Sequence, residues 1–326
     1  MKMIITGAAG FIGSNLTKEL LKLDYEIVAI DNFSTGSADN LSPVKDHPKL
    51  TTITCNVQDH ASWGDKAAEG DIIFHLAATV GVKKVFSNSH DTFTNNLDGM
   101  TAVLEVAHKK KCKVFFASTS EVYGQSKGVP FAETDPLSAY TTNEGRSAYV
   151  ISKMANEVSC LNYHNLKGVP VIIARLFNVI GRGQRKEFGM VVPTFIDAAL
   201  SGNPLTLYGD GLQTRGFCNV KDFLTAVIAL IQEPKAWGDV YNIGQNITTT
   251  IEELAGYIIK VSNSKSELLY TKLPPERIGK IEIYSRQPNI EKIRALTGWS
   301  PIISWQTSVN EILTELHAKS HPVDSI

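Results

Sequence analysis

Short apolar, β-prone runs punctuate the first part of the chain, and segments with the apolar spacing of helices lie between them. The strands predicted in this way are Lys2–Thr6, Glu26–Ile30, Leu50–Cys55, Asp71–Leu76, Lys113–Ser118 and Val171–Phe177. Helices are predicted from Ser14 onward, over Ser89–Lys110 and over the segment that begins at Arg146. Alternation of strand and helix through residue 179 is typical of a doubly wound parallel sheet of the Rossmann type, an α/β fold.

The pattern changes after Phe177. Short strands and helices follow without a regular βαβ rhythm, and the helices are predicted at Val191–Leu200, Asp222–Ile231, Ile251–Val261 and Trp305–Leu316. We therefore predict a first domain over residues 1–179 and a smaller C-terminal α+β lobe over residues 180–326, whose segments interleave with the first domain. The cleft between two such parts is where we expect an active site.

Composition narrows the function classes. The chain of 326 residues is long enough for a sizeable core, and its formal net charge of -1 provides no basic field for nucleic acid or an anionic membrane. The four cysteines are widely separated and lack the spacing of a metal site, so we expect them to be reduced and buried. Because residues 1–6 already have the pattern of a strand and no apolar run reaches membrane-spanning length, we expect a cytosolic protein.

A glycine-rich turn joins the first predicted strand to the first predicted helix. Gly7, Gly10 and Gly13 follow the strand at three-residue intervals. Such a turn lets the backbone approach a pyrophosphate and directs the helix N-terminus at its charge. Asp31 ends the second strand, where a carboxylate accepts hydrogen bonds from the adenosine ribose and repels a 2′-phosphate. The sequence therefore predicts a dinucleotide site for NAD rather than NADP.

Other residues are placed along the same cofactor by their positions in this turn, at or after the ends of strands, or in the predicted helix Ser89–Lys110. They are Phe11, Ile12, Asn32, Ser34, Gly36, Asn56, Val57, Leu76, Ala77, Ala78, Asn96 and Ser118. Small residues such as Ala77 and Ala78 let a backbone pass close to a ligand, and a polar residue inside a core-facing helix, such as Asn96, needs a hydrogen-bonding partner.

Tyr149 and Lys153 lie four residues apart at the start of a predicted helix, so both side chains project from one face about one turn apart. A free phenol, with a pKa of about 10, is a poor base at neutral pH, but a neighbouring ammonium favours the phenolate. Tyr149 is therefore a candidate acid and base whose pKa Lys153 is expected to lower.

A fixed order of motifs runs through the chain: Gly7-x-x-Gly10-x-x-Gly13, Asp31, Ala77-Ala78, Ser118-Thr-Ser, Tyr149-x-x-x-Lys153 and Arg175-Leu-Phe-Asn178. In this order the motifs resemble the extended short-chain dehydrogenase/reductase family, which includes the NAD-dependent sugar-nucleotide epimerases, dehydratases and decarboxylases. The resemblance covers essentially the whole chain.

The resemblance implies roles for individual residues. Tyr149 would take the proton from a sugar hydroxyl, Lys153 would bind the nicotinamide ribose, and Thr119 would hydrogen-bond the reacting oxygen. Phe177 would pack near the nicotinamide. The remaining implied contacts are to a nucleoside-diphosphate sugar, expected to be a UDP-sugar, and they involve Asn178, Val192, Tyr208, Arg215 and Arg277. Relatives often form homodimers through the helices that follow Gly99 and Ala148, and we expect the same here.

Three reactions branch from one 4-keto sugar, and the segment Thr119-Ser120-Glu121 bears on all of them. A 4,6-dehydratase needs a pair of acids after the threonine, and Ser120 stands where such enzymes carry aspartate, so dehydration is disfavoured. UDP-glucuronate decarboxylases typically have Thr-Ser-Glu here, and Arg182 or Arg185 could hold a substrate carboxylate. Serine directly before Lys153 resembles the epimerase form. The sequence favours 4-epimerisation of a UDP-hexose or UDP-hexuronate, with decarboxylation as the alternative and dehydration or a non-catalytic NAD sensor behind them.

Overall fold

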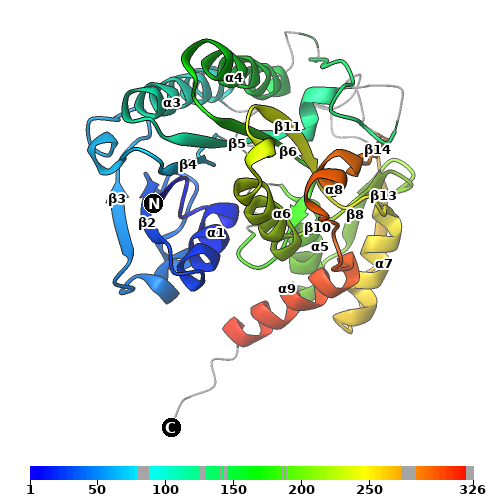
Figure 1. Cartoon of the computed structure of the whole chain (residues 1–326). Helices are drawn as coiled ribbons and strands as arrows, with labels where there is room; N and C mark the ends of the chain where they lie inside the picture. The colour runs from blue at the N-terminus through cyan, green and yellow to red at the C-terminus, as the bar shows by residue number, and fades with distance from the viewer. Residues whose placement is uncertain are drawn as a thin grey trace.

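A seven-stranded parallel sheet forms the centre of the molecule, which is described here from a computed structural model (Figure 1). The structure describes residues 1–79, 88–124, 129–139, 141, 145–184, 187, 189–272 and 284–320. The strand order is β11-β6-β5-β4-β1-β2-β3. The strand bounds are β1 Lys2–Thr6, β2 Glu26–Asp31, β3 Leu50–Thr54, β4 Ile72–His75, β5 Lys113–Thr119, β6 Val171–Leu176 and β11 Asp239–Ile243. The predicted α/β, Rossmann-type fold is confirmed.

Strand β11 corrects the prediction that the sheet ends with the strand after residue 170. Residues Asp239–Ile243 pair in parallel with β6, so a segment from the later part of the chain completes the sheet. The run Asp-Val-Tyr-Asn-Ile has the β-branched and aromatic residues of a strand, and it follows a helix, so the signal was present in the sequence. Because this strand comes from the later part, that part contributes directly to the central sheet; the boundary at residue 179 stays a prediction.

Helices cover both faces of the sheet. Helices α3 (Ser89–Lys110) and α4 (Gly145–Lys167) lie side by side on one face, and α1 (Phe11–Lys22) and α6 (Val220–Gln232) lie on the other (Figure 1). Each helix turns its apolar positions toward the strands, which alternate their side chains between the two faces. Two buried clusters result, one against α1 and α6 and one against α3 and α4.

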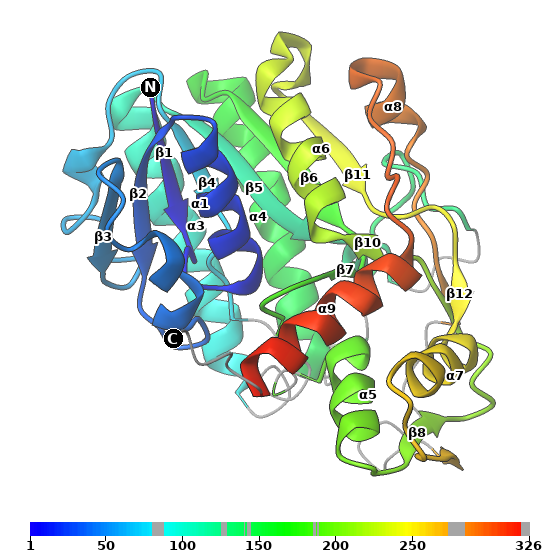
Figure 2. The ribbon, with the colours of Figure 1, turned by 90° about the horizontal axis from the view of Figure 1, so that it is seen from below.

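Most of the elements that follow residue 179 pack around a separate hydrophobic core at one side of the sheet (Figure 2). The short strands among them form small sheets in the orders β10-β7, β12-β9-β14 and β13-β8. The strands are β7 Val179–Ile180, β8 Leu205–Tyr208, β9 Thr214–Arg215, β10 Cys218–Asn219, β12 Thr249–Thr250, β13 Leu268–Thr271 and β14 Ser285–Arg286. The helices are α5 Val191–Leu200, α7 Ile251–Val261, α8 Glu291–Thr297 and α9 Trp305–Ser320.

Short 3₁₀ turns connect several of these elements. They are η1 Ala38–Asn40, η2 Ser42–Val44, η3 Gly64–Lys66, η4 Ser120–Tyr123 and η6 Pro234–Ala236. Within the described residues, every helix is too short or too polar to cross a bilayer. The expected cytosolic location stays a prediction.

Candidate active site

The glycine turn between β1 and α1 is packed so closely that side chains larger than hydrogen are excluded. Gly7 has a φ of +73°, and a Cβ atom there would lie 2.7 Å from the backbone nitrogen of Ala77. A Cβ on Gly13 would lie 2.1 Å from the carbonyl oxygen of Gly7. Gly36, in the loop after β2, approaches the backbone of Ala9 in the same way, with 2.8 Å from its Cβ position to the carbonyl carbon. The loops after β1, β2 and β4 therefore meet and form one cradle, a concave surface lined by backbone atoms.

Asp31 fixes the adenosine side of this cradle. Its carboxylate accepts hydrogen bonds from the backbone N–H of Ala9 at 2.8 Å and of Phe33 at 2.7 Å, so it ties the glycine turn to the end of β2. Asn32 donates its side-chain amide to the Asn56 side chain at 2.7 Å, which links the ends of β2 and β3. A fixed carboxylate beside a helix N-terminus and a glycine-lined cradle fits an adenine dinucleotide.

Asn96 links the helices to the segment that follows β4. Its side-chain oxygen accepts from the Thr79 N–H at 2.9 Å, and its amide donates to Ser152 Oγ at 3.1 Å. Its own carbonyl accepts from the Asn156 side chain at 3.0 Å. The hydrogen-bonding partner that the sequence required for this buried polar residue is therefore found. The Asn96 side chain holds the chain just after Ala78, beside the predicted cofactor site.

Lys153 lies behind the end of β5. Its Nζ donates to the Ala117 carbonyl at 2.8 Å and lies 4.7 Å from the centre of the Phe116 ring and 5.9 Å from the centre of the Tyr149 ring. Burial lowers the pKa of Lys153 to about 8, against partial opposition from Cys160 and Glu157. The ammonium is thus poised to lose its proton just above neutral pH.

Tyr149 departs from one prediction. Burial, and next the negative charge of Glu121, raise the pKa of Tyr149, while a hydrogen bond with Thr119 acts in the opposite direction. The expected lowering of this pKa by Lys153 is therefore wrong for this structure, because burial and Glu121 raise it and Lys153 is not among the groups that lower it. The hydrogen bond does place the phenol oxygen beside Thr119, where the sequence predicted the reacting hydroxyl to lie.

Glu121 stands at the centre of a small group of charges. Thr119 caps the 3₁₀ turn η4 by accepting from the Glu121 N–H at 3.2 Å, and this turn directs the Glu121 side chain toward Arg146, whose Nε is 3.0 Å away. Arg286, on β14, lies 3.8 Å from the same carboxylate. Ser120 is buried in the turn. The glutamate of the predicted Thr-Ser-Glu segment thus lies next to two arginines, Arg146 and Arg286.

Arg286 was missed by the sequence analysis. It is 7% exposed, and its Nε and Nη2 atoms have no hydrogen-bond partner among the residues that the structure describes. Arg286 is also in register with Arg215 across the parallel β14–β9 pair. The buried N–H groups of Arg286, next to a second arginine whose own Nη1 donates to backbone carbonyls, favour an anion. No local pattern in Ser-Arg-Gln-Pro signals this role, because the burial of Arg286 depends on segments far away in the sequence.

The other predicted substrate residues are spread over several elements. Asn178 has a φ of +35°, and its buried Nδ2 has no hydrogen-bond partner in the described part of the chain. Arg215 donates to the carbonyls of Thr214 at 2.8 Å and Tyr284 at 3.3 Å. Val192 is buried on α5 and Tyr208 is half exposed at the end of β8. Arg277 and Arg185 lie outside the described residues.

Phe177 is packed away from solvent. Its ring is 0% exposed and lies with Tyr123 and Phe131 in an aromatic cluster, at centroid distances of 6.0 and 6.4 Å. This gives Phe177 a packing role behind the site, and its contact with the nicotinamide stays a prediction.

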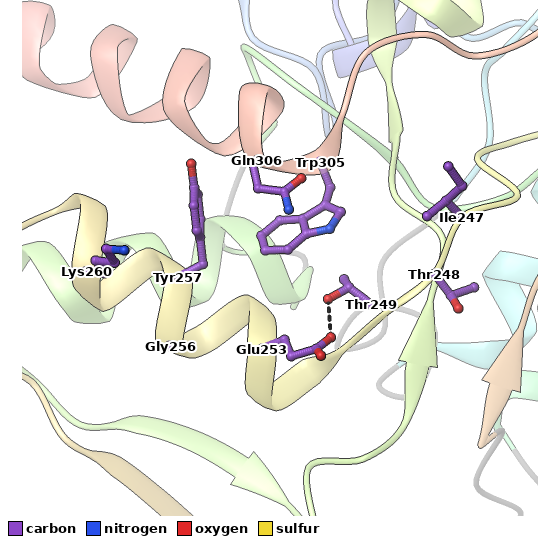
Figure 3. A pocket seen from close by; sticks show the side chains of 9 residues that line it. All are labelled: Ile247, Thr248, Thr249, Glu253, Gly256, Tyr257, Lys260, Trp305 and Gln306. Carbon is purple, nitrogen blue, oxygen red and sulfur yellow. Dashed lines mark hydrogen bonds between the residues drawn. The ribbon is translucent and has the colours of Figure 1, made fainter.

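A separate groove of about 550 Å³ lies between α7 and the start of α9 (Figure 3). The rings of Tyr257 and Trp305 meet edge to face in it, 5.0 Å apart, and Thr249 donates to the carboxylate of Glu253 at 2.8 Å. None of the predicted site residues lines this groove. Among the described residues, no group of histidine, cysteine, aspartate and glutamate side chains has the arrangement of a metal site.

Comparison with known proteins agrees with this geometry. The profile of the NAD dependent epimerase/dehydratase family matches residues 3–244. A UDP-N-acetyl-alpha-D-glucosaminuronate decarboxylase of Bacillus cytotoxicus is 38% identical over 96% of this chain and 96% of its own length. A UDP-glucuronic acid decarboxylase 1 of Danio rerio is 31% identical over 96% of this chain and 72% of its own length. The solved UDP-N-acetylglucosamine 4-epimerase of Methanobrevibacter ruminantium M1 is 27% identical, with a TM-score of 0.88 over 98% of both chains.

The fold and the site therefore define an NAD-dependent enzyme, and the chain belongs to the NAD dependent epimerase/dehydratase family. The resemblance to the extended short-chain dehydrogenases/reductases and the prediction of NAD as cofactor are both confirmed.

Proposed function

We propose that the protein decarboxylates a UDP-hexuronate through a transient 4-keto sugar. The observation that carries this proposal is Arg286: a buried guanidinium with two unpartnered nitrogen atoms, beside Glu121 and in register with Arg215. A buried arginine of this kind is stabilised by a planar carboxylate that accepts two of its N–H groups. The sequence motifs favour 4-epimerisation, and the buried Arg286 moves the preference to decarboxylation.

The relatives support the same choice. The Bacillus cytotoxicus protein is named for decarboxylation of UDP-N-acetyl-glucosaminuronate, and the Danio rerio protein for decarboxylation of UDP-glucuronic acid. Both substrates carry a carboxylate on the sugar and UDP as the nucleotide. By analogy, the substrate here is a UDP-sugar acid, with its diphosphate near Arg215.

The residues of this chain would divide the work as follows. Tyr149, whose hydroxyl lies beside Thr119, exchanges the proton of the C4 hydroxyl, while Thr119 holds that oxygen. Because its pKa is raised, Tyr149 has to lose its own proton first, and the charges of Arg146 and Arg286 favour that loss. NAD, held by the glycine turn and Asp31, supplies the acceptor for the hydride from C4 when it is bound. The carboxylate on C5 is then β to a ketone. Its C5–C6 bond breaks, carbon dioxide leaves, and the bonding electrons pass toward the C4 oxygen until C5 gains a proton. The hydride would then return to C4 while Tyr149 gives the proton back to the C4 oxygen, so the cofactor is unchanged over the whole reaction.

A second candidate is 4-epimerisation. Ser152, directly before Lys153, matches the epimerase form, and a solved 4-epimerase shares the fold over nearly the whole chain. Epimerisation of a UDP-hexose leaves Arg286 without a carboxylate partner, whereas epimerisation of a UDP-hexuronate would supply one, so the products decide between that reaction and decarboxylation. Dehydration stays disfavoured, since Ser120 cannot act as the acid that this reaction requires.

Product analysis separates the candidates. The purified protein is mixed separately with UDP-glucuronate, UDP-N-acetyl-glucosaminuronate, UDP-glucose and UDP-N-acetylglucosamine, and the products are identified by mass and sugar NMR. We expect loss of carbon dioxide from one of the two uronates. An unchanged mass with an inverted C4 would instead establish the epimerase, and loss of water the dehydratase.

Replacing Arg286 tests the residue itself. Arg286→Met should lower kcat/KM for the uronate by roughly 10- to 100-fold, because about 1.5–3 kcal/mol of charge-assisted hydrogen bonding is lost. Arg294→Met is the matched control, since Arg294 is exposed and paired with Glu291 on the surface. Equal activity in both variants would remove the support for a carboxylate substrate.

We also propose that the protein forms a homodimer through α3 and α4. Val158 and Leu166 are exposed on α4, at 58% and 81%, on a helix that otherwise packs against the sheet and α3. Apolar side chains in such positions are common at subunit contacts. Light scattering of the purified protein would measure its mass in solution, and a monomer would contradict the proposal.

A further inference from the structure

A buried ion pair lies one helical turn beyond Lys153, and the proposed chemistry does not use it. Glu157 on α4 meets Arg175 on β6: Arg175 Nε is 3.1 Å from Oε1, and Nη2 is 2.7 Å from Oε2. The two side chains are only 4% and 5% exposed. Replacing a buried ion pair of this kind by apolar residues is often neutral or stabilising, because removing both charges from water is costly. Stability alone therefore does not explain why these charges lie beside Lys153.

The ion pair is tied to the strand that carries the reacting segment. Ser118 Oγ donates to Glu157 Oε1, and Ser118 directly precedes Thr119 at the end of β5. Glu157 thus holds the side chain of the residue next to Thr119, at the start of the segment that presents Thr119 and Glu121 to the site.

On its other side the ion pair reaches toward β14. Arg175 Nη1 donates to the Tyr123 hydroxyl at 2.9 Å, and that hydroxyl donates to Asn242 Oδ1 at 2.7 Å. The Asn242 amide donates in turn to the Phe131 carbonyl at 2.9 Å. The Phe131 N–H donates to the carbonyl of Gln287, the residue after Arg286, at 2.9 Å. A continuous hydrogen-bond network therefore joins the helix of Tyr149 and Lys153 to the residue that follows Arg286.

We propose that Glu157 is a positioning residue for the reaction: through Ser118 it fixes the end of β5, and with its negative charge it keeps Lys153 protonated at neutral pH. The proposal rests on the proposed function only in requiring Tyr149 and Lys153 as the catalytic pair, and it holds for decarboxylation and epimerisation alike.

The charges around Lys153 support this role. The titratable and charged groups that face it are Tyr149, Glu157 and Cys160 from α4, His75 from β4, and Arg175 from β6 through its pair with Glu157. Burial lowers the pKa of Lys153 to about 8, and the Glu157 carboxylate acts against that lowering. Without Glu157 the pKa of Lys153 falls further, so Lys153 loses its charge at a lower pH.

The experiment compares Glu157→Gln with the double variant Glu157→Gln/Arg175→Met in the full-length protein with saturating NAD. The single variant leaves the Arg175 charge buried and unpaired, so its melting temperature should fall strongly. The double variant removes both charges and should regain most of that stability. We expect it to keep two defects: a turnover at least tenfold lower above neutral pH, and an alkaline limb of the kcat/KM profile that is shifted toward acid by about one pH unit.

Two further variants separate the two parts of the role. Glu157→Asp keeps the charge, so its alkaline limb should stay where it is in the wild type although its turnover falls. Ser118→Ala removes the hydrogen bond between β5 and Glu157 but keeps the Glu157 charge, so at saturating NAD it should lower kcat without moving the alkaline limb. A double variant with the turnover and the pH profile of the wild type would overturn the proposal.

A spectroscopic readout keeps the test independent of substrate identity. Wild-type and double-variant protein are labelled with ¹³C-lysine, and the Lys153 signal, assigned by its loss in Lys153→Met, is followed against pH by NMR. A lower titration midpoint in the variant supports the proposal, and an unchanged midpoint overturns it, even if no nucleotide sugar is turned over. If the double variant does not fold, the same titration is made on Glu157→Gln.

Discussion

The two sides of the candidate site are built by different means. On the cofactor side, backbone atoms lie in direct contact: a Cβ on Gly13 would lie 2.1 Å from the Gly7 carbonyl, and one on Gly7 would lie 2.7 Å from the Ala77 nitrogen. On the substrate side, long charged side chains meet instead. Glu121 lies between Arg146 at 3.0 Å and Arg286 at 3.8 Å.

The difference has a consequence for function. A backbone cradle recognises a cofactor by shape and by its fixed N–H groups, so it tolerates almost no substitution. A group of arginine and glutamate side chains recognises a substrate by charge, and changing one residue changes which sugar is accepted. We therefore expect substitutions on the cofactor side to weaken NAD binding and so to lower turnover of every substrate. Substitutions on the substrate side should change turnover of some sugars more than of others.

Tyr149→Phe is expected to have the largest effect, because Tyr149 lies where the two sides meet. The variant removes only the ionisable oxygen, so turnover should fall by roughly 10²- to 10⁴-fold. NAD affinity and melting temperature should stay within experimental error of the wild type. Full activity in this variant would show that another group takes the proton and would refute the assignment.

Gly13→Ala tests the cofactor side alone. The new methyl group would meet the Gly7 carbonyl, a backbone atom that cannot rotate away, so NAD affinity should fall by at least about tenfold and stability by about 1–3 kcal/mol. Gly256→Ala is the matched control, since nothing lies within 4 Å of its Cβ position on α7. That change should raise stability by about 1 kcal/mol. Titration calorimetry with NAD and denaturant melts measure both, and similar losses in the two variants would contradict the close-packed cradle.

The cofactor side could be predicted from the sequence because its determinants are local. Gly7, Gly10, Gly13 and Asp31 act within a strand, a turn and a helix that follow one another in the chain, and strand ends in parallel sheets meet at one edge. The strand positions were likewise correct to within one or two residues, since buried parallel strands are continuous apolar runs.

The substrate side could not be predicted to the same extent. Arg286 becomes a site residue only because β14 pairs with β9 and lies against η4, which are contacts between segments more than 60 residues apart along the chain. The raised pKa of Tyr149 likewise comes chiefly from burial, and burial depends on the packed structure rather than on the spacing of Tyr149 and Lys153. Strand β11 carried a local signal, and it was overlooked because the regular βαβ rhythm had already ended.

The smallest expected effect concerns His75, which lies under the cofactor side. Its Nδ1 is 2.9 Å from Thr6 Oγ1, and burial, with a further contribution from Lys153, lowers its pKa from 6.5 to about 3. The folded protein therefore keeps His75 neutral where the unfolded chain protonates it, so the free energy of unfolding falls as the pH drops from 6.5 toward 3, by about 1.4 kcal/mol per pH unit. His75→Gln keeps a hydrogen-bonding group near Thr6 but does not titrate, so its unfolding free energy should fall less steeply.

Urea melts of the wild type and of His75→Gln at about pH 7 and about pH 5 measure how steeply the unfolding free energy of each falls. All other titratable groups contribute equally to both proteins. Parallel slopes would mean that the interior beside the backbone cradle accepts a charged histidine, and the contrast between recognition by backbone atoms and recognition by charged side chains would not hold.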